Sequence, residues 1–171
     1  MEESFESFSR SNEETLKGRF LTFQLGKEAY GIDLKHVIEI VSLKPLTEMP
    51  EMSEYIKGII NLRGKVVPVM DVRLRFKMQP KEYDDRTCII VVDLNGYSIG
   101  MIIDSVSETI QINSKEIMKK PDMCTKDGCN YIKGIVNKGD MVILLIDCEE
   151  LIGFDERYVI SERTDKYEKV V

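Results

Sequence analysis

The sequence predicts an all-β protein built from two small, pseudo-symmetric barrels of five strands each, with a few short helices. Two observations support this fold class: short apolar runs alternate with tight-turn residues, and the pentapeptide YIKGI occurs twice, at residues 55–59 and 131–135. Strands this short bury their apolar faces only by curling into a barrel or by packing as a sandwich. With 171 residues, of which 43% are hydrophobic, the chain is long enough to build such a core.

The two ends of the chain lack this pattern. Residues 1–18 are rich in Glu and Ser, with Phe5 and Phe8 isolated among them, and we expect a flexible arm there. Residues 153–171 form a charged tail, for which we expect a helix or a frayed end. The predicted folded domain therefore spans residues 19–152.

Two β-hairpins are the most clearly predicted elements. The first joins RFLTFQL, which starts at Arg19, to EAYGID through Gly-Lys at 26–27. The second joins CIIVVDL to YSIGMII through Asn-Gly at 95–96, a pair that accommodates the two positive φ angles of a type I′ turn. A shift of 69 residues superimposes the hairpins and matches four residue pairs: Leu25 with Leu94, Gly31 with Gly100, Val37 with Val106 and Glu39 with Glu108.

Three short helices are expected, around LKHVIEI, around SEYI and from Cys148 onward. Each YIKGI is followed by a turn and a further apolar strand, KVVPVMD or MVILLID, and a shift of 76 residues aligns these copies. Pro68 lacks a ladder donor, which places its strand at an edge or a bulge. We therefore expect one barrel from each repeat, over residues 19–78 and 86–148, with a short insertion near KPDMCTKDGC in the second.

The charge balance excludes one class of partner. The net charge is −6, from 24 Lys and Arg against 30 Asp and Glu. Nucleic-acid binding requires clustered positive charge, so nucleic acid is not an expected partner. No basic segment followed by an apolar stretch opens the chain, and no apolar run approaches the length that spans a bilayer. We expect a cytoplasmic protein without direct membrane insertion.

The four cysteines do not form a recognisable ligand set. Cys88 and Cys148 lie in apolar runs, where cysteine acts as a small hydrophobic residue. Cys124 and Cys129 could oxidise or hold a metal, but a zinc site needs about four ligands and His36 is the only histidine. We expect free thiols, no metal and no cofactor.

The search for catalytic motifs gives one candidate, the G-x-S-x-G pattern around Ser98. In a hydrolase this serine lies between a strand and a helix, whereas Ser98 lies in the returning strand of the second hairpin. His36 precedes it and lies among apolar residues, which favours packing over catalysis. Asp71 and Asp147 end equivalent strands, which favours capping of backbone N–H groups over a catalytic acid pair. We therefore expect no enzyme activity.

Two basic features remain. The run Arg73, Arg75 and Lys77 is interpreted as a solvated face, with an acidic docking partner as the alternative. The tetrapeptide NLRG places Arg63 in a tight turn, where Gly64 can adopt a positive φ angle. A guanidinium held there suits directional recognition or a fixed ion pair; otherwise it is an exposed turn residue.

The segment GIINLRGKVVPVMDVR resembles the signature of CheW-like domains, in which G-x-x-N-L-R-G leads into an apolar strand with an internal proline and a closing Asp. FLTFQLGKEAYGID, VIEI, IGMIIDSV and YIKGI resemble further stretches of the family in the same order, from Arg19 to Ile152. The resemblance implies Src-homology-3-like topology for both barrels. It also implies a stand-alone, non-catalytic chemotaxis adaptor, recruited to membrane receptor arrays. One surface would bind the regulatory domain of the histidine kinase CheA and another the cytoplasmic tips of chemoreceptors.

By the same resemblance, Glu39 and Arg63 form a charge pair that either contacts the receptor or holds the strands that do. Val37 and Ile38 are expected to line a groove for an apolar receptor helix, although strand alternation makes core positions equally expected. The motif turn comprises three further residues: Asn61, Leu62 and Gly64. The kinase surface is expected to consist of apolar strand edges, which no motif identifies.

Two alternatives remain open. The same fold could couple a receptor to a kinase in a pathway other than chemotaxis, and the sequence does not separate the two roles. An esterase-like enzyme would require Ser98 to be exposed, with His36 within hydrogen-bonding distance.

Overall fold

The computed structural model describes residues 16–119 and 130–152, so most of the predicted N-terminal arm, the insertion and the tail lie outside the described residues. Within these ranges the chain forms ten strands: β1 (Arg19–Leu25), β2 (Glu28–Asp33), β3 (Val37–Ser42), β4 (Ile56–Leu62), β5 (Lys65–Asp71), β6 (Cys88–Leu94), β7 (Tyr97–Ile103), β8 (Ser105–Gln111), β9 (Ile132–Lys138) and β10 (Met141–Ile146). The helical elements with both ends in these ranges are two 3-10 helices, η1 (Leu34–His36) and η2 (Ser114–Glu116), and two α-helices, α2 (Val72–Arg75) and α3 (Cys148–Ile152).

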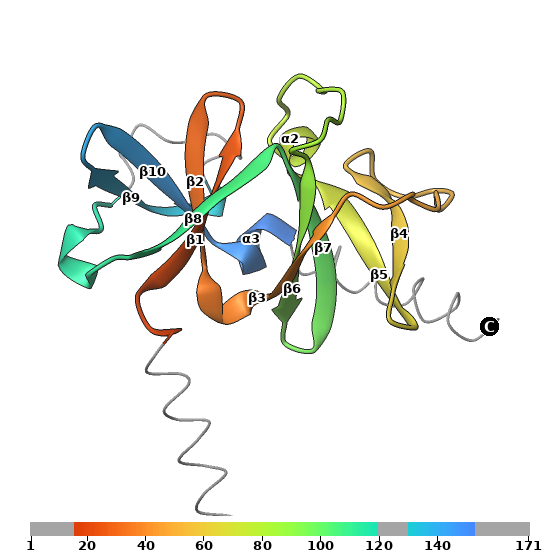
Figure 1. The fold of residues 1–171 in the computed structure, drawn as a ribbon, viewed down its shortest axis with the longest axis horizontal. Helices are drawn as coiled ribbons and strands as arrows, with labels where there is room; N and C mark the ends of the chain where they lie inside the picture. The colour runs from red at the N-terminus through yellow and green to blue at the C-terminus, as the bar shows by residue number, and fades with distance from the viewer. Residues whose placement is uncertain (1–15, 120–129, 153–171) are drawn as a thin grey trace, which may run out of the picture.

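The strands form two five-stranded sheets. Sheet A has the order β8-β1-β2-β10-β9, and sheet B has the order β3-β6-β7-β5-β4. Figure 1 shows them as two neighbouring lobes, with α3 between them. The ladders do not close, since no pairing among the described residues joins β8 to β9 or β3 to β4. The predicted all-β class is confirmed, and the arrangement fits two Src-homology-3-like units with few helices.

The sheets do not coincide with the two sequence repeats. Sheet B is built from the consecutive strands β3 to β7, whereas sheet A combines the first hairpin, β1 and β2, with β8, β9 and β10. The expectation that residues 19–78 and 86–148 each form one barrel is therefore corrected. Each hairpin pairs with strands of the other repeat, because β1 forms a ladder with β8 and β6 forms one with β3.

The pseudo-symmetry of the repeats is preserved in spite of this exchange. Phe23 pairs with Val106 in sheet A. The residues 69 positions away from these two, Val92 and Val37, pair with each other in sheet B. Residues of the two sheets can therefore be compared one by one, with a shift of 69 for the hairpins and for β3 with β8, and a shift of 76 for β4 with β9 and β5 with β10.

The hydrophobic core has three parts. The largest cluster lies between the sheets and combines side chains of both with those of α3. Each sheet also has a smaller cluster of its own. Strand alternation explains this division: Ile90 and Val92 of β6 join the shared cluster, whereas Ile89 and Val91 join the cluster of sheet B. Strands buried on both faces therefore appear in the sequence as continuous apolar runs.

The helix predictions are partly wrong. In LKHVIEI only Leu34–His36 is helical, and VIEI forms β3, because β-branched residues with alternating burial favour a strand. In SEYI, residues 53–55 form a loop and turn before β4 begins at Ile56. The helix predicted from Cys148 is confirmed as α3, and its predicted continuation lies outside the described residues.

The edge position predicted for the Pro68 strand is also wrong, because β5 lies between β7 and β4. Pro68 is opposite Ile59, whose backbone N–H and C=O bond instead to Thr47 on the other side of β4. Parallel pairing of β5 with β7 starts one residue later, at Val69. The missing N–H of Pro68 therefore interrupts neither ladder, although an irregularity occurs nearby in β4, at residues 56–58.

The basic run in and after α2 connects the sheets. Arg73 forms a two-point ion pair with Asp104, with Nε–Oδ1 and Nη2–Oδ2 distances of 2.7 and 2.6 Å. The same carboxylate accepts a hydrogen bond from the N–H of Gly26 in the β1–β2 turn of sheet A, at 2.7 Å. Arg75 lies between the tyrosine rings of the two YIKGI copies, 4.8 and 4.6 Å from their centroids. The solvated-face interpretation is therefore wrong for both arginines and holds only for the exposed Lys77.

Candidate functional site

The NLRG motif forms the turn between β4 and β5. Arg63 and Gly64 have φ angles of 54° and 82°, the two positive values of a type I′ turn. The side chain of Asn61 accepts a hydrogen bond from the N–H of Gly64 at 2.9 Å, and Leu62 packs against the cluster of sheet B. A left-handed conformation costs a non-glycine residue about 1 kcal/mol. Arg63 therefore occupies a position that glycine would adopt more easily.

Arg63 forms the predicted pair with Glu39 of β3, with an Nη2–Oε2 distance of 3.0 Å. β3 and β4 are the two end strands of sheet B, so this pair bridges the open ends of the sheet. The Arg63 side chain is 81% exposed and that of Glu39 is 21% exposed. Exposed ion pairs contribute only about 0–1 kcal/mol to stability, so the pair is a weak brace for the fold.

The outer face of β3 presents two exposed isoleucines. Ile38 is 51% exposed and Ile40 is 44% exposed. Val37, the expected companion of Ile38 in a groove, is partly buried and packs against the shared core. The register of β3 with β6 shifts between Val37 and Glu39, so Val37 and Ile38 lie at a β-bulge. Sequence reasoning missed Ile40, and the strand alternation of VIEI is the signal that identifies it.

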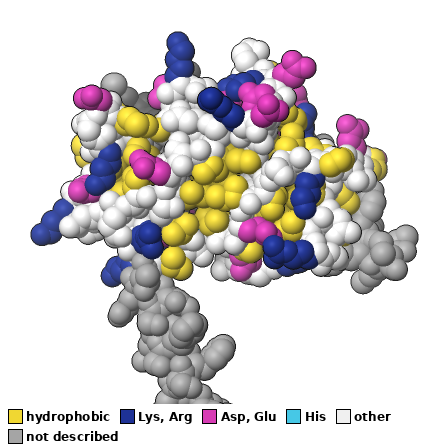
Figure 2. Space-filling view, viewed as in Figure 1, with side chains coloured by type: hydrophobic (Ala, Val, Ile, Leu, Met, Phe, Trp, Pro, Cys, Tyr) yellow, Lys and Arg dark blue, Asp and Glu magenta, His cyan; other side chains and the backbone are white. Residues whose placement is uncertain are grey.

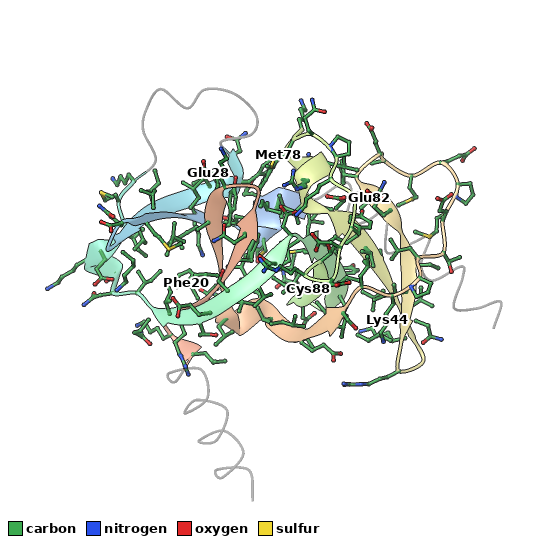
Figure 3. The ribbon with its side chains drawn as sticks, turned by 45° about the horizontal axis from the view of Figure 1, so that its top comes forward. Phe20, Glu28, Lys44, Met78, Glu82 and Cys88 are labelled. Carbon is green, nitrogen blue, oxygen red and sulfur yellow. The ribbon has the colours of Figure 1, made fainter. Side chains whose placement is uncertain are left out.

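An apolar surface lies where the two sheets meet. Figure 2 shows hydrophobic side chains gathered on the face where β3 and β8 run, and these are end strands of sheets B and A. Val37 and its pseudo-equivalent Val106 are both partly buried there. Cys88 of β6 also lies between the sheets (Figure 3), and its sulfur accepts a hydrogen bond from the backbone N–H of Val106. We refer to Val37, Ile38, Ile40, Cys88 and Val106 as the junction surface.

The surroundings of Ser98 do not resemble a nucleophile site. Ser98 lies within β7, and its hydroxyl accepts a hydrogen bond from Lys65 at 3.2 Å. A hydrolase serine would occupy a turn between a strand and a helix. His36 is half-buried in η1.

Asp71 and Asp147 act as helix caps, as the sequence predicted. The carboxylate of Asp71 accepts a hydrogen bond from the N–H of Leu74 at 3.3 Å. That of Asp147 accepts hydrogen bonds from the N–H groups of Glu149 and Glu150, at 3.0 and 3.3 Å. Each aspartate satisfies donors in the first turn of the helix that follows it.

The described part of the chain contains no group of three or more His, Cys, Asp or Glu side chains that could hold a metal ion. Cys124 and Cys129 lie outside that part. Cys88 and Cys148 are free thiols, and burial raises the pKa of the Cys148 thiol to about 12. No helix within residues 16–119 and 130–152 is long and apolar enough to cross a bilayer.

Comparison with known proteins gives a consistent result. Residues 19–156 match the CheW-like domain family. The chain is 33% identical to the chemotaxis protein CheW of Klebsiella aerogenes over 86% of this chain and 89% of that protein, and 32% identical to that of Helicobacter pylori over 90% and 92%. The crystal structure of the scaffolding protein TtCheW from Thermoanaerobacter tengcongensis has a TM-score of 0.75 and 34% identity, and the match covers 81% of this chain and 94% of that one. The chain therefore belongs to the CheW-like domain family.

Proposed function

We propose that this chain is a chemotaxis adaptor that couples chemoreceptors to the histidine kinase CheA. The observation that carries the proposal is its similarity to chemotaxis CheW proteins over nearly the whole described domain, in both sequence and fold. This favours chemotaxis over another receptor–kinase pathway. The adaptor acts without catalysis and is recruited to membrane receptor arrays by its partners. The lysine contact and strand position of Ser98 argue against the esterase alternative.

In this proposal the receptor tip binds the junction surface. A receptor helix presents apolar residues at intervals of three and four, and such a ridge packs on apolar side chains at the edges of two sheets. Ile38 and Ile40 are accessible for this contact without rearrangement. The ion pair of Glu39 with Arg63 adjoins them on β3 and would fix the orientation of the helix.

Arg63 is proposed to contact the receptor directly, with Glu39 as the residue that positions it. Three observations support this division: the Arg63 side chain is 81% exposed, its backbone adopts a left-handed conformation, and the equivalent turn in sheet A has Gly139 instead. A residue that keeps an unfavourable backbone conformation without stabilising the fold is a candidate for function.

The kinase is proposed to bind a second apolar surface, on sheet A. Met141 and Val142 open β10 directly after the β9–β10 turn and are 49% and 51% exposed, and Met118 is 51% exposed. β9 is an end strand of its sheet. Exposed apolar residues on β10 and beside the end strand β9 suit packing against the barrel of the CheA regulatory domain.

The test measures autophosphorylation of a CheA-type kinase with a receptor signalling-tip fragment, in the presence of wild-type protein, Arg63→Ala or Glu39→Ala. Wild-type protein should stimulate the kinase. Arg63→Ala should bind the receptor fragment at least about tenfold more weakly, the loss expected for a hot-spot residue, while kinase binding is retained. Lys27→Ala, at an exposed position in the β1–β2 turn, is the control and should behave as wild type.

The double variant Glu39→Arg with Arg63→Glu separates the two roles of the pair. It keeps an ion pair between the strands but moves the positive charge away from the turn. Continued loss of receptor binding would support direct contact by Arg63, and recovery would assign the pair a bracing role. Absence of stimulation and of binding to either partner by the wild-type protein would contradict the adaptor proposal for that receptor and kinase.

A further inference from the structure

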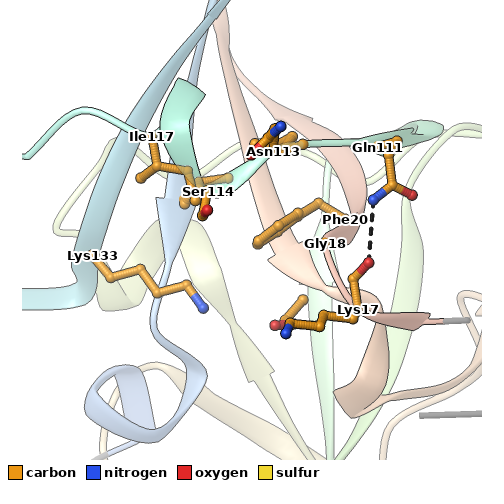
Figure 4. Close-up of a pocket in the computed structure, with 11 residues that line it drawn as sticks. Lys17, Gly18, Phe20, Gln111, Asn113, Ser114, Ile117 and Lys133 are labelled. Carbon is orange, nitrogen blue, oxygen red and sulfur yellow. Dashed lines mark hydrogen bonds between the residues drawn. The ribbon is translucent and has the colours of Figure 1, made fainter. Parts of the chain in front are cut away.

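Sheet A contains a pocket of about 620 Å³ that the proposed function does not use. Its floor is apolar, and the four residues that form it are Phe20, Ile112, Ile117 and Leu145. Lys17 and Lys133 enter it from two sides (Figure 4), and the Lys133 Nζ lies 5.5 Å from the centroid of the Phe20 ring. Lys17 is the second described residue after the N-terminal segment, so the pocket lies where that segment enters the fold.

In sheet B, Tyr83 covers the cluster that contains the residues equivalent to the pocket floor. A shift of 69 relates Phe20 to Ile89 and Ile112 to Leu43, and a shift of 76 relates Leu145 to Val69. Ile117 corresponds to Leu46, because each immediately precedes a residue that forms an equivalent bridge, Met118 with Ile135 and Thr47 with Ile59. All four counterparts belong to or pack against the cluster of sheet B. Tyr83 packs against the same cluster, and its hydroxyl donates a hydrogen bond to Asp71 at 2.8 Å. No aromatic counterpart of Tyr83 packs against the cluster of sheet A among the described residues.

The position of Tyr83 in the sequence indicates which segment could cover the pocket of sheet A. Tyr83 belongs to the segment that immediately precedes β6, the first strand of the second hairpin. By the pseudo-symmetry, the corresponding segment precedes β1, and it is the N-terminal segment of the chain. We propose that the pocket of sheet A is the docking site of residues 1–15 of the same chain, with Phe8 as the apolar anchor.

The composition of this segment complements the pocket. Residues 1–15 contain five glutamates and one arginine. The pocket lining has one acid, Asp33, which pairs with Lys35, and two lysines, Lys17 and Lys133, for which the described residues contain no ion-pair partner. The nine steps of chain from Phe8 to Lys17 span up to about 30 Å when extended, which is ample for a return to an adjoining pocket. Phe8 is a better anchor than Phe5 because it closes the shorter loop.

The test uses methyl-labelled full-length protein and records NMR signals of the Ile112, Ile117 and Leu145 methyl groups. The aromatic protons of Phe8 should show nuclear Overhauser contacts with the Ile117 methyls. Phe8→Ser should abolish these contacts and shift the floor methyls, whereas the matched control Phe5→Ser should leave them in place. Lys133→Gln should weaken docking, seen as a partial shift in the same direction as Phe8→Ser.

Three outcomes would overturn the proposal. Floor methyl signals that are identical in wild type and Phe8→Ser would show that the segment does not dock. Contacts that disappear on dilution would show that the occupant comes from a second copy of the chain. Contacts from the methyl group of Met123 in place of Phe8 would assign the pocket to another segment.

Discussion

Sheets A and B have the same strand order, yet their equivalent positions carry different side chains. Where sheet B pairs Glu39 with Arg63, sheet A has Glu108 and Gly139, and Glu108 forms no ion pair among the described residues. Sheet A has a different pair close to its β9–β10 turn, Lys138 with Glu116 at 3.1 Å. Because the same backbone arrangement forms with and without the Glu39–Arg63 pair, the fold does not require it.

A second contrast concerns the contacts that join the sheets. The positions equivalent to Asp104 and Arg73 are Lys35 and Glu149, with the charges exchanged. Arg73 and Asp104 form a bidentate pair, whereas no ion pair joins Lys35 to Glu149 within the described ranges. We refer to the Arg73–Asp104 pair as the clamp; it has no counterpart at the equivalent positions. Contacts that recur at equivalent positions of both sheets are candidates for requirements of the fold, and contacts found in one sheet only are not required by it.

The largest expected loss of stability concerns two glycines at equivalent positions of the two sheets, Gly58 and Gly134. A Cβ atom at Gly58 would clash with the backbone oxygen of Thr47, at a φ angle of +149°. At the equivalent Gly134 its tightest contact would be a side-chain methyl group of Ile117, and the nearest backbone atom, the oxygen of Met118, would lie 3.4 Å away. Gly58→Ala should cost about 3 kcal/mol or more, from backbone strain plus overpacking, and Gly134→Ala should cost less. Urea unfolding measures both values, and equal losses would contradict the comparison.

The next effect concerns the clamp between the sheets. Asp104→Ala leaves Arg73 partly buried without its partner and should lower the free energy of unfolding by about 2 kcal/mol. Lys35→Ala, at the equivalent position, should change it by less than about 0.5 kcal/mol. Thermal unfolding of the two variants at neutral pH tests this difference.

The clamp should also depend on pH. Burial alone would raise the pKa of Asp104, but the hydrogen bonds from Arg73 and Gly26 outweigh burial and hold it below its ordinary value. Because the folded pKa is depressed, this stabilisation is present above the unfolded value of about 3.9 and is lost as the pH falls through the folded pKa. The stability difference between wild type and Asp104→Ala should therefore shrink only in acid, and a difference that disappears near neutral pH would exclude this origin.

A smaller change in stability is expected at the NLRG turn. Arg63→Gly removes an exposed pair but also relieves the left-handed conformation, so the free energy of unfolding should stay within about 1 kcal/mol of wild type. Receptor-dependent kinase stimulation should nevertheless be lost. The reverse change, Gly139→Arg in sheet A, should not create receptor binding there. A large loss of stability in Arg63→Gly would make the arginine a structural residue.

The last comparison concerns a position where the sheets are alike. Cys148 opens α3 and its equivalent, Val72, opens α2, and both side chains are buried. Cys148→Val should change stability by less than about 1.5 kcal/mol, as for other volume-conserving core substitutions. Since the pKa of the Cys148 thiol is raised to about 12, alkylation at neutral pH should require unfolding. Mass spectrometry of peptides from the alkylated native protein tests this, and rapid modification of Cys148 in the native protein would contradict it.

The sequence was sufficient for the features that local chemistry determines. Asn95 and Gly96 identify the turn of the second hairpin, with φ angles of 54° and 90°, and the strand ends at Asp71 and Asp147 identify helix caps. The exchange of strands between the repeats was not predictable, because the alternation of β1 is the same whichever copy it pairs with. The burial of Arg73 depends on Asp104, 31 residues away, and no local pattern reports such a contact.

The candidate site was predictable to a similar extent. Family resemblance identified Glu39 and Arg63, and the structure places their side chains in contact. Which of Val37 and Ile38 is exposed could be assigned only from the structure, because the sequence pattern does not show which neighbour in a strand faces the core. The pocket beside Phe20 was not predictable, because an incomplete cover is visible only when the two sheets are compared in space.

The exchange of strands also determines the order in which the protein can assemble during synthesis. All strands of sheet B are present once the ribosome has released the chain as far as β7, because this sheet is contiguous in the sequence. Sheet A must wait for β10: the β1 edge of its first hairpin gains its partner when β8 is made, but the β2 edge has none until β10 is complete. A nascent chain stalled after β7 and before β10 would have one complete sheet and an apolar hairpin without its full set of partner strands. Exposed apolar surface of this kind promotes aggregation, and chaperones counteract it.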